Sequence, residues 1–282
     1  MGDLASKLPG PLVDADWLAA HRDDPDLRII DFRWYLDGRS GLAAYEAGHV
    51  PGAAFVDLAG DVTGHVPGAG RHPLPAAVAF ERAMRAAGVG SDSVVIAYDD
   101  TGGSTAARLW WMLRYFGHDA AAVLDGGLAA WPGPLATGVE QPGPGDFTAG
   151  PPRDHLKVDY EDVRRRSEDV VLLDARAPER YRGEVEPVDP RAGHVPGARS
   201  AFFGGNLDDQ LRFLPADALR RRYEALGAAG GADIVVYCGS GVTACHDLLA
   251  LERAGIPGAR LYVGSWSDWS SRPDAPIATG ED

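Results

Sequence analysis

The sequence predicts an α/β protein made of two tandem domains, each with a central parallel sheet flanked by helices. The first supporting observation is an internal repeat: the hexapeptide GHVPGA occurs at residues 48–53 and again at residues 193–198. Each copy stands in a longer matching context of apolar runs and amphipathic stretches. The spacing between the copies is too long for a solenoid repeat, so we expect two homologous domains.

The second observation is the pattern of short apolar runs within each half. The first half contains RIIDF, VVIAYD and AAVLD, and the second contains VVLLDA, IVVYC and RLYVG. These runs are rich in valine and isoleucine and do not alternate strictly, which is typical of strands buried on both faces of a parallel sheet. Amphipathic stretches such as AAVAFERAMRAAG and ADALRRRYEALG separate them and predict helices.

The domain boundaries follow from composition. Residues 136–154, ATGVEQPGPGDFTAGPPRD, are rich in glycine and proline and show no apolar periodicity. Such a segment is typical of a linker. We therefore expect a first domain at residues 1–135 and a second at residues 155–282.

Charge and cysteine content exclude several classes of protein. The 282 residues carry a formal net charge of −14, whereas a nucleic-acid partner requires a basic face. Two cysteines are too few for a disulfide framework and predict a reducing, cytoplasmic setting. The N-terminus lacks the pattern of a signal peptide, and no apolar run approaches the ~18 residues of a membrane span.

The segment VYCGSGVTAC, residues 236–245, combines features of a reactive cysteine. Cys238 ends an apolar run, and a helical stretch follows the turn at once. Free N–H groups at a helix N-terminus stabilise a thiolate, and Gly239 and Gly241 allow the chain to curl into an anion-binding nest. Ser240 or Thr243 can cap the helix. From these residues alone, a buried structural cysteine is an equally good interpretation.

The first half carries a different residue at the matching place. There the sequence reads VVIAYDDTGG, so that Asp99 matches Cys238. A carboxylate cannot perform thiol chemistry. The comparison predicts one working domain and one scaffolding domain.

Taken in order, both GHVPGA motifs, LDGGLAAW, CGSGVTAC and GSWSDW resemble the two-domain rhodanese-type sulfurtransferases, and most closely their 3-mercaptopyruvate branch. The resemblance covers residues 10–275. It implies two rhodanese-like domains, an active site between them, and catalysis by the C-terminal one alone. It also implies a persulfide on Cys238 during turnover, no cofactor, a small-molecule sulfur donor, and a thiol, thioredoxin or cyanide as acceptor.

The loop between Cys238 and Thr243 bears on the donor. It contains no cation, whereas thiosulfate-preferring rhodaneses carry basic side chains there, as a dianion requires. A neutral loop favours mercaptopyruvate, with Ser240 donating a hydrogen bond to the departing enolate. We expect Gly239, Gly241, Val242 and Thr243 to contribute to substrate binding.

Two alternatives stay open at this point. One is a thiosulfate:cyanide sulfurtransferase, and the other is a rhodanese-like binding module without catalysis, which would lack the cysteine in both halves. A phosphatase with a related cysteine loop would require an arginine that closes the loop, and the residues GSGVTA contain none.

The resemblance also assigns residues outside the loop. Arg180, in PERYRGEVE, matches the arginine that binds the donor's carboxylate, for which a guanidinium is well suited. Arg191 stands near the place of a second such arginine, although its spacing from GHVPGA differs, and it can equally be a surface charge. Arg71 and His72, in GRHPLP, are expected to line the site from the first domain.

A histidine relay is a further expectation from the resemblance. His49 and Asp37 would act with Ser240 in the manner of a Ser-His-Asp triad. The alternative for His49 is a loop histidine bonded to the backbone, since its repeat mate His194 requires such a structural role. No metal site is expected, because Cys238 and Cys245 do not have a zinc spacing, and Cys245 is expected to pack in the core.

Overall fold

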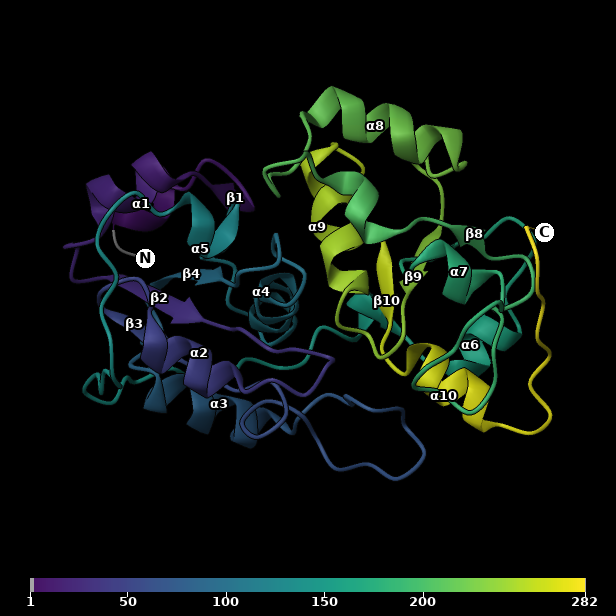
Figure 1. The fold of residues 1–282 in the computed structure, drawn as a ribbon, viewed down its shortest axis with the longest axis horizontal. Helices are drawn as coiled ribbons and strands as arrows, with labels where there is room; N and C mark the ends of the chain where they lie inside the picture. The colour runs from purple at the N-terminus through teal and green to yellow at the C-terminus, as the bar shows by residue number, and fades with distance from the viewer. Residues whose placement is uncertain (1–2, 282) are drawn as a thin grey trace. The chain divides into compact units, whose positions relative to one another are not determined.

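The computed structural model describes residues 3–281 and divides into two compact units (Figure 1). The first unit comprises the chain up to Thr63, Pro75–Arg153 and Asp209–Arg212. The second comprises Gly64–Leu74, Asp154–Asp208 and the chain from Phe213 onward. The segment Gly64–Leu74 of the first half thus belongs to the second unit, and Asp209–Arg212 of the second half belongs to the first.

The first unit contains a five-stranded parallel sheet in the order β1-β5-β4-β2-β3. Helices connect its strands, as the alternating pattern predicts. The strands are β1 Leu12–Val13, β2 Leu27–Asp31, β3 Ala53–Phe55, β4 Val94–Tyr98 and β5 Ala121–Leu124, and the helices are η1 Asp3–Lys7, α1 Ala15–His21, α2 Gly41–Ala47, α3 Ala77–Ala86, α4 Ala106–Tyr115 and α5 Gly127–Ala130.

The second unit repeats this topology in the order β6-β10-β9-β7-β8, again with parallel strands throughout. Its strands are β6 Lys157–Val158, β7 Val171–Asp174, β8 Arg199–Ser200, β9 Ile234–Tyr237 and β10 Arg260–Tyr262, and its helices are η2 Asp154–Leu156, α6 Tyr160–Arg164, α7 Pro178–Tyr181, η3 Phe203–Asn206, α8 Ala216–Ala225, α9 Ala244–Arg253 and α10 Ser265–Ser271. The predicted α/β class with two tandem parallel sheets is confirmed.

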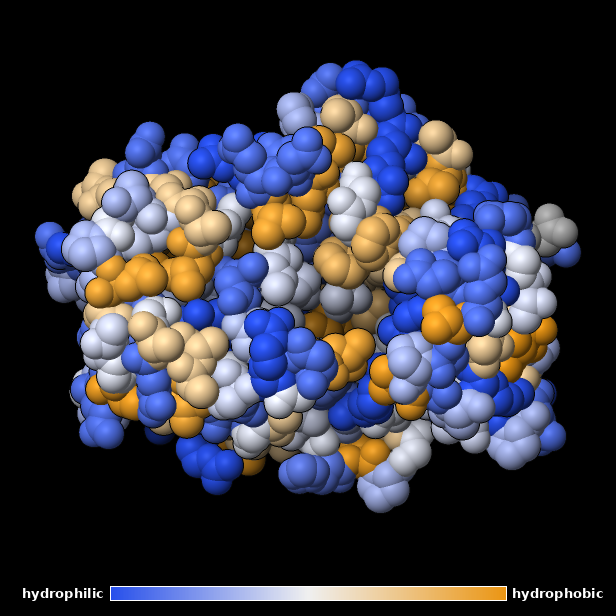
Figure 2. Space-filling model, viewed as in Figure 1, coloured by the Kyte–Doolittle hydropathy of each residue, from blue (hydrophilic) through white to orange (hydrophobic). Residues whose placement is uncertain are grey.

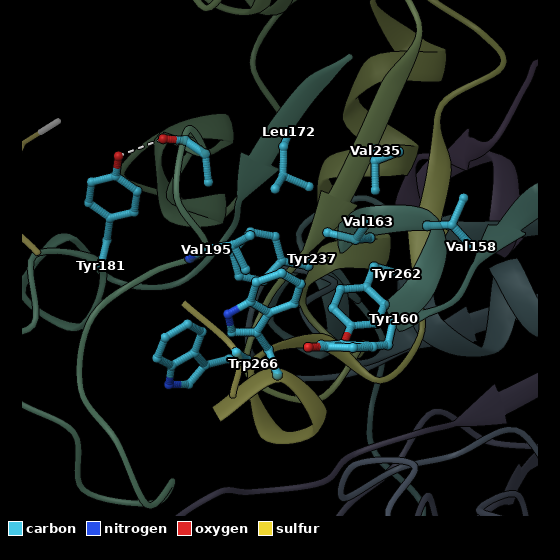
Figure 3. Close-up of a cluster of buried hydrophobic side chains, with 13 residues drawn as sticks. Val158, Tyr160, Val163, Leu172, Tyr181, Val195, Val235, Tyr237, Tyr262 and Trp266 are labelled. Atoms are coloured by element: carbon cyan, nitrogen blue, oxygen red, sulfur yellow. Dashed lines mark hydrogen bonds between the residues drawn. The ribbon is translucent and has the colours of Figure 1, made fainter. Parts of the chain in front are cut away.

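Aromatic side chains form much of the core of the second unit. One face of the sheet packs against α6, α7 and α10, where Tyr237, Tyr262 and Trp266 meet aliphatic side chains (Figure 3). Helices α8 and α9 pack together, and α9 also packs against β9. Only Leu219 and Tyr223 of α8 are buried, and hydrophilic side chains cover its outer face (Figure 2). No helix within residues 3–281 has the length and hydropathy required to cross a membrane.

A buried ion pair explains part of the internal repeat. In the first unit, the Arg33 guanidinium donates to both carboxylate oxygens of Asp31 and to the carbonyl of Gly48, the latter over 2.8 Å. In the second unit, Arg176 donates in the same way to Asp174 and to the carbonyl of Gly193, over 2.7 Å. Each pair therefore ties the end of a central strand to the start of a GHVPGA turn.

The histidine of each GHVPGA motif has the same surroundings in both units. His49 stacks on Tyr45 with ring centroids 3.9 Å apart, and its Nδ1 lies 2.9 Å from the Tyr45 carbonyl oxygen. His194 stacks on Tyr181 at 3.8 Å, and its Nδ1 lies 2.8 Å from the Tyr181 carbonyl oxygen. Both histidines are fully buried. The repeated histidine therefore joins the turn to the preceding helix.

The glycine- and proline-rich segment 136–154 lies along the first unit. Ala136 forms a bridge with His49, Phe147 is buried, and Gly150 donates to the carbonyl of Phe116 over 2.8 Å. The lack of apolar periodicity thus reflects an irregular segment that is fixed by backbone bonds, which differs from a loose connector.

A buried polar cluster surrounds Asp247 in the first turn of α9. Asp247 accepts a hydrogen bond from Asn206 Nδ2 over 2.7 Å, and Asn206 Oδ1 accepts from Tyr223 and Arg222. Asp247 Oδ2 is buried and has no hydrogen-bond partner among the described residues. Burial raises the pKa of Asp247 to about 7.

Replacement of Asp247 by asparagine should reveal this raised pKa as a dependence of stability on pH. In the unfolded chain the carboxyl group titrates near a pKa of about 3.9, so the unfolded state loses its proton first as pH rises. The free energy of unfolding therefore falls as pH rises from about 4 to about 7, by on the order of 4 kcal/mol in total. Above that range this group causes no further change.

Because asparagine does not titrate, the free energy of unfolding of Asp247→Asn relative to the original should rise across that range and then level off. Urea unfolding of both proteins at a series of pH values measures the difference. A difference that is independent of pH would contradict the prediction.

Candidate active site

The main chain at Cys238 is held from both sides. Cys238 follows β9 directly, and its N–H donates to Ser265 Oγ over 3.1 Å. Its carbonyl accepts from the N–H of Trp266, and that of Gly239 accepts from the N–H of Ser267, each over 2.9 Å. Ser265 adopts a φ of 53°, which is strained for a residue with a side chain. The start of α10 therefore fixes the cysteine's backbone.

The loop after Cys238 leads directly into α9. Gly241 has a φ of 76°, the left-handed conformation that glycine adopts without strain. Thr243 is the N-cap residue, but its side chain makes no capping hydrogen bond within the described structure. Ser240 bonds elsewhere, so the expectation that either side chain caps α9 is wrong. Cys245 is fully buried, and its thiol donates to the Gly241 carbonyl over 3.4 Å.

The corresponding loop of the first unit shows what this backbone can bind. There the Asp99 carboxylate accepts hydrogen bonds from the N–H groups of Thr101, Gly103, Thr105 and Ala106, at 2.8–2.9 Å. Asp99 is fully buried. The loop of the first unit is therefore an anion-binding nest that the chain fills with its own carboxylate. The loop after Cys238 shares one feature of this backbone, since Gly241 adopts a φ of 76° and the matching Gly102 a φ of 71°.

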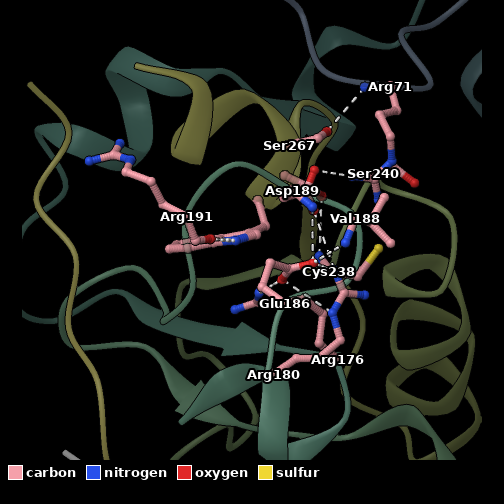
Figure 4. A network of polar contacts seen from close by, with 12 residues as sticks. Arg71, Arg176, Arg180, Glu186, Val188, Asp189, Arg191, Cys238, Ser240 and Ser267 are labelled. Atoms are coloured by element: carbon pink, nitrogen blue, oxygen red, sulfur yellow. Dashed lines mark hydrogen bonds and ion pairs between the residues drawn. The ribbon is translucent and has the colours of Figure 1, made fainter. Parts of the chain in front are cut away.

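Two guanidinium groups, of Arg71 and Arg180, lie close to Gly239 in the cysteine loop, and Figure 4 draws both arginines with Cys238 and Ser240. A Cβ added to Gly239 would lie 2.9 Å from Arg71 Nη2 and 3.4 Å from Arg180 Nη1. Arg71 comes from the segment Gly64–Leu74 and Arg180 from α7. Glycine at position 239 thus leaves room for both cations beside the thiol.

Two buried carboxylates hold these cations. Glu186 accepts from Arg180 Nη2 over 2.6 Å and from Arg180 Nε over 3.2 Å. Asp189 accepts from Arg71 through one oxygen and from Arg180 Nη2 over 3.3 Å through the other. Figure 4 shows the carboxylates between the arginines. The cations are therefore fixed in place before any anion binds.

A histidine contacts the loop serine. Nδ1 of His72 lies 2.8 Å from Oγ of Ser240, and both residues are largely buried. His72 follows Arg71 directly in the sequence, so one short segment supplies both a cation and an imidazole to the site. The guanidinium can bind an anion beside the thiol, and the pair of imidazole and hydroxyl can exchange a proton with that anion.

Comparison with known proteins identifies the architecture. A profile of the rhodanese-like domain matches residues 14–133 and 159–272. The chain belongs to the rhodanese family. Both five-stranded units are thus rhodanese domains.

Several relatives align over almost the whole chain. A probable 3-mercaptopyruvate sulfurtransferase of Pseudomonas aeruginosa is 46% identical, over 96% of this chain and 98% of its own. A putative thiosulfate sulfurtransferase of Mycobacterium tuberculosis is 42% identical, over 91% and 92%. The crystal structure of a 3-mercaptopyruvate sulfurtransferase of Escherichia coli superposes with a TM-score of 0.82 at 36% identity, covering 92% of this chain and 99% of that one.

His49 and Asp37, the residues of the expected relay, both belong to the first unit. Nδ1 of His49 lies 2.9 Å from the Tyr45 carbonyl oxygen, and Nε2 lies 3.4 Å from Glu140 and makes no hydrogen bond within the described residues. Asp37 is exposed and pairs with Arg39 over 2.8 Å. The GHVPGA histidine has the same tyrosine stack and backbone contact in both units, which is consistent with the structural alternative for His49. The histidine that meets Ser240 is His72.

Arg191 also has a structural position. Its guanidinium donates to four main-chain carbonyls in the last turn of α10 and just after it, those of Trp269, Ser270, Arg272 and Ala275. A cation at the C-terminus of a helix satisfies carbonyls that lack partners in the helix. These contacts occupy the donors that a substrate carboxylate would require.

Sequence reasoning missed Ser265, Glu186 and Asp189 at this site. Ser265 lies in the GSWSDW segment, and nothing in that sequence indicates a bond from its side chain to the main chain of Cys238. Glu186 and Asp189 lie in the acidic stretch after Arg180, where the carboxylates look like surface charges. Within residues 3–281, no group of three or more histidine, cysteine, aspartate or glutamate side chains could hold a metal ion.

Replacement of Arg180 by methionine should test the cation pair through the reactivity of the thiol. Iodoacetate and iodoacetamide alkylate the same thiol, but only iodoacetate carries a carboxylate. Loss of one guanidinium near Gly239 should slow iodoacetate by about five- to tenfold relative to iodoacetamide. Labelling rates at fixed pH and ionic strength measure the effect, and Cys238→Ser identifies the labelled residue. Equal slowing of both reagents would argue against an anion site here.

Proposed function

We propose that this chain is a sulfurtransferase that takes a sulfur atom from 3-mercaptopyruvate onto Cys238 and passes it to a thiol or cyanide. The observation that carries the proposal is the pair Arg71 and Arg180, which face Gly239 beside a thiol in an otherwise uncharged loop. Two fixed guanidiniums are well suited to the carboxylate of a small donor. The second rhodanese domain is the catalytic one, and Asp99 makes the first a scaffold.

The first step is an attack of the Cys238 thiolate on the donor's sulfur. A sulfur–sulfur bond forms, the carbon–sulfur bond of mercaptopyruvate breaks, and its electron pair remains on the carbon as pyruvate enolate. The enolate then takes up a proton and leaves as pyruvate. The persulfide anion on Cys238 lies in the backbone nest whose counterpart in the first unit binds the Asp99 carboxylate.

Ser240 and His72 supply the hydrogen bond and the proton for the leaving group. Their contact of 2.8 Å supports a shared role at the leaving group. Ser240 donates to the enolate oxygen, in the manner of an oxyanion donor, and His72 accepts from or donates to Ser240 as the proton moves. The loop residues Gly241, Val242 and Thr243 contribute to the binding of the donor.

The second step returns the cysteine to its thiolate. An acceptor thiolate or cyanide attacks the outer sulfur of the persulfide, the sulfur–sulfur bond breaks, and its electron pair returns to Cys238. Candidate acceptors are a small thiol, thioredoxin and cyanide. The net charge of −14 supports the absence of a nucleic-acid partner, and the two free cysteines support a cytoplasmic location.

Thiosulfate is the second candidate donor. The mycobacterial relative at 42% identity is named as a putative thiosulfate sulfurtransferase, although that protein's donor need not be shared. A rhodanese-like binding module without catalysis is less consistent with the site, because it needs no cysteine next to a glycine that two arginines face.

Replacement of Cys238 by serine should abolish sulfur transfer, whereas Cys245→Ser should retain most of it. Cys238 lies at the strand end beside both guanidiniums, and Cys245 is bonded back to Gly241 within the core. Intact-mass measurement after exposure to mercaptopyruvate should show one added sulfur atom, and peptide mapping should locate it on residue 238. Turnover by the Cys238 variant, with loss in the Cys245 variant, would assign the wrong thiol.

The two histidines should respond differently to replacement by glutamine. His72→Gln should lower kcat with mercaptopyruvate by about 10²-fold, the usual contribution of a positioned acid or base, with little change in thermal stability. His49→Gln should lower the melting temperature, because it removes a buried stack and a backbone bond. Steady-state kinetics and thermal unfolding of both variants separate the roles. A kinetic defect confined to His49→Gln would restore the relay expected from the sequence.

A further inference from the structure

The strongest unassigned feature of the site is its pair of buried carboxylates, Glu186 and Asp189. Each has a side chain only 3% exposed, compared with 14% for Arg180 and 27% for Arg71. Buried carboxylates are rare and costly unless they are paired. Their position under the two donor-facing guanidiniums requires an explanation beyond solubility.

Glu186 is fixed by many contacts. Its Oε1 accepts from the N–H groups of Val188 and Asp189, each over 3.1 Å, in addition to Arg180. Its Oε2 accepts from Arg176 over 3.3 Å, and Arg176 is itself bonded to Asp174 at the end of β7. The carboxylate thus shapes the turn that carries Asp189 and connects Arg180 to the sheet.

Asp189 bridges the two cations. One oxygen meets Arg71, which comes from a segment far away in the sequence, and the other meets Arg180. A single carboxylate therefore sets the distance between the two guanidiniums at Gly239. It also supplies a negative charge to both.

We propose that Glu186 and Asp189 are positioning residues that set the charge of donor the site accepts. This inference rests on the proposed sulfurtransferase function. Three guanidiniums, of Arg71, Arg176 and Arg180, are balanced by three carboxylates, of Asp174, Glu186 and Asp189. The site therefore offers fixed hydrogen-bond donors with little excess positive charge.

Such a site discriminates against a dianion. The carboxylate of mercaptopyruvate accepts directed hydrogen bonds from the guanidiniums, and its single negative charge lies among groups whose charges nearly cancel. The second charge of thiosulfate finds no cation in the loop Gly239–Val242, and it is repelled by the carboxylates below the arginines. Selectivity by charge thus comes from a segment about 50 residues before the cysteine as well as from the loop.

The test compares Asp189→Asn with the unmodified full-length chain, with thiosulfate and mercaptopyruvate as donors at fixed ionic strength. Removal of one negative charge strengthens attraction for both donors, but roughly twice as much for the dianion. The ratio of kcat/KM for thiosulfate to that for mercaptopyruvate should rise about tenfold, mainly through the KM for thiosulfate. Glu186→Gln is the second variant and should shift the ratio in the same direction.

Glu184→Gln is the matched control. It removes the same charge from the same segment, but the Glu184 side chain is 58% exposed and pairs with Arg182 over 2.7 Å. Its effect on the donor ratio should stay within about twofold because solvent screens exposed charges. Asp189→Glu keeps the negative charge, so its ratio of kcat/KM for the two donors should match that of the unmodified chain.

The outcomes separate the two proposals. An unchanged ratio in both folded variants would overturn the selectivity role, and so would an equal loss of kcat/KM for both donors, which a purely structural pair predicts. If either variant fails to show a cooperative thermal transition, the other decides. Absence of transfer from both donors in the unmodified chain would overturn the sulfurtransferase function and, with it, this inference.

Discussion

The buried pair of Asp174 and Arg176 is the interaction on which the fold and the site of the second unit both depend. It joins the end of β7 to the GHVPGA turn, and the Arg176 guanidinium also lies over the Trp266 ring at 4.5 Å. Its remaining nitrogen reaches Glu186. Removal of one partner from such a pair would leave an uncompensated buried charge, at a cost of about 3–5 kcal/mol. A contact that stabilises the sheet thus also anchors the acidic turn that holds Arg180.

The duplicated chain shows how one backbone served two purposes. In the first unit, Asp31 and Arg33 form the same pair, and the nest after β4 is filled by Asp99. A carboxylate that belongs to the chain satisfies those N–H groups permanently. At the equivalent place in the second unit, Cys238 takes the position of Asp99, and the side chain of the N-cap residue Thr243 makes no capping bond within the described structure. The two loops also differ at neighbouring positions, including Gly239 in place of Asp100, so more than one substitution separates them.

Much of the fold could be predicted from the sequence because it depends on local signals. The apolar runs predicted the central strands. The internal repeat predicted two homologous domains and showed that Asp99 matches Cys238. At the site, the sequence indicated Cys238 through its strand–turn–helix context and, with the family resemblance, Arg180, Arg71 and His72. It could not show that His72 contacts Ser240 or that Asp189 contacts Arg71, because each pair is more than 100 residues apart and no periodicity reports such contacts. The roles expected for His49 and Arg191 stay predictions, since a repeated motif marks structure as readily as chemistry and a cation beside a motif can also bond a helix end.

The origin of positive charge at this site limits what the cysteine loop alone can indicate. A basic side chain at position 239 would need room there, where even a methyl group would approach Arg71 within 2.9 Å. The cations instead come from two other segments, and buried carboxylates offset them. Because the loop and these segments are separate in sequence, the charge presented to a donor can change without any change in CGSGVT. A neutral loop therefore indicates the donor's charge only together with the carboxylates that hold the arginines in place.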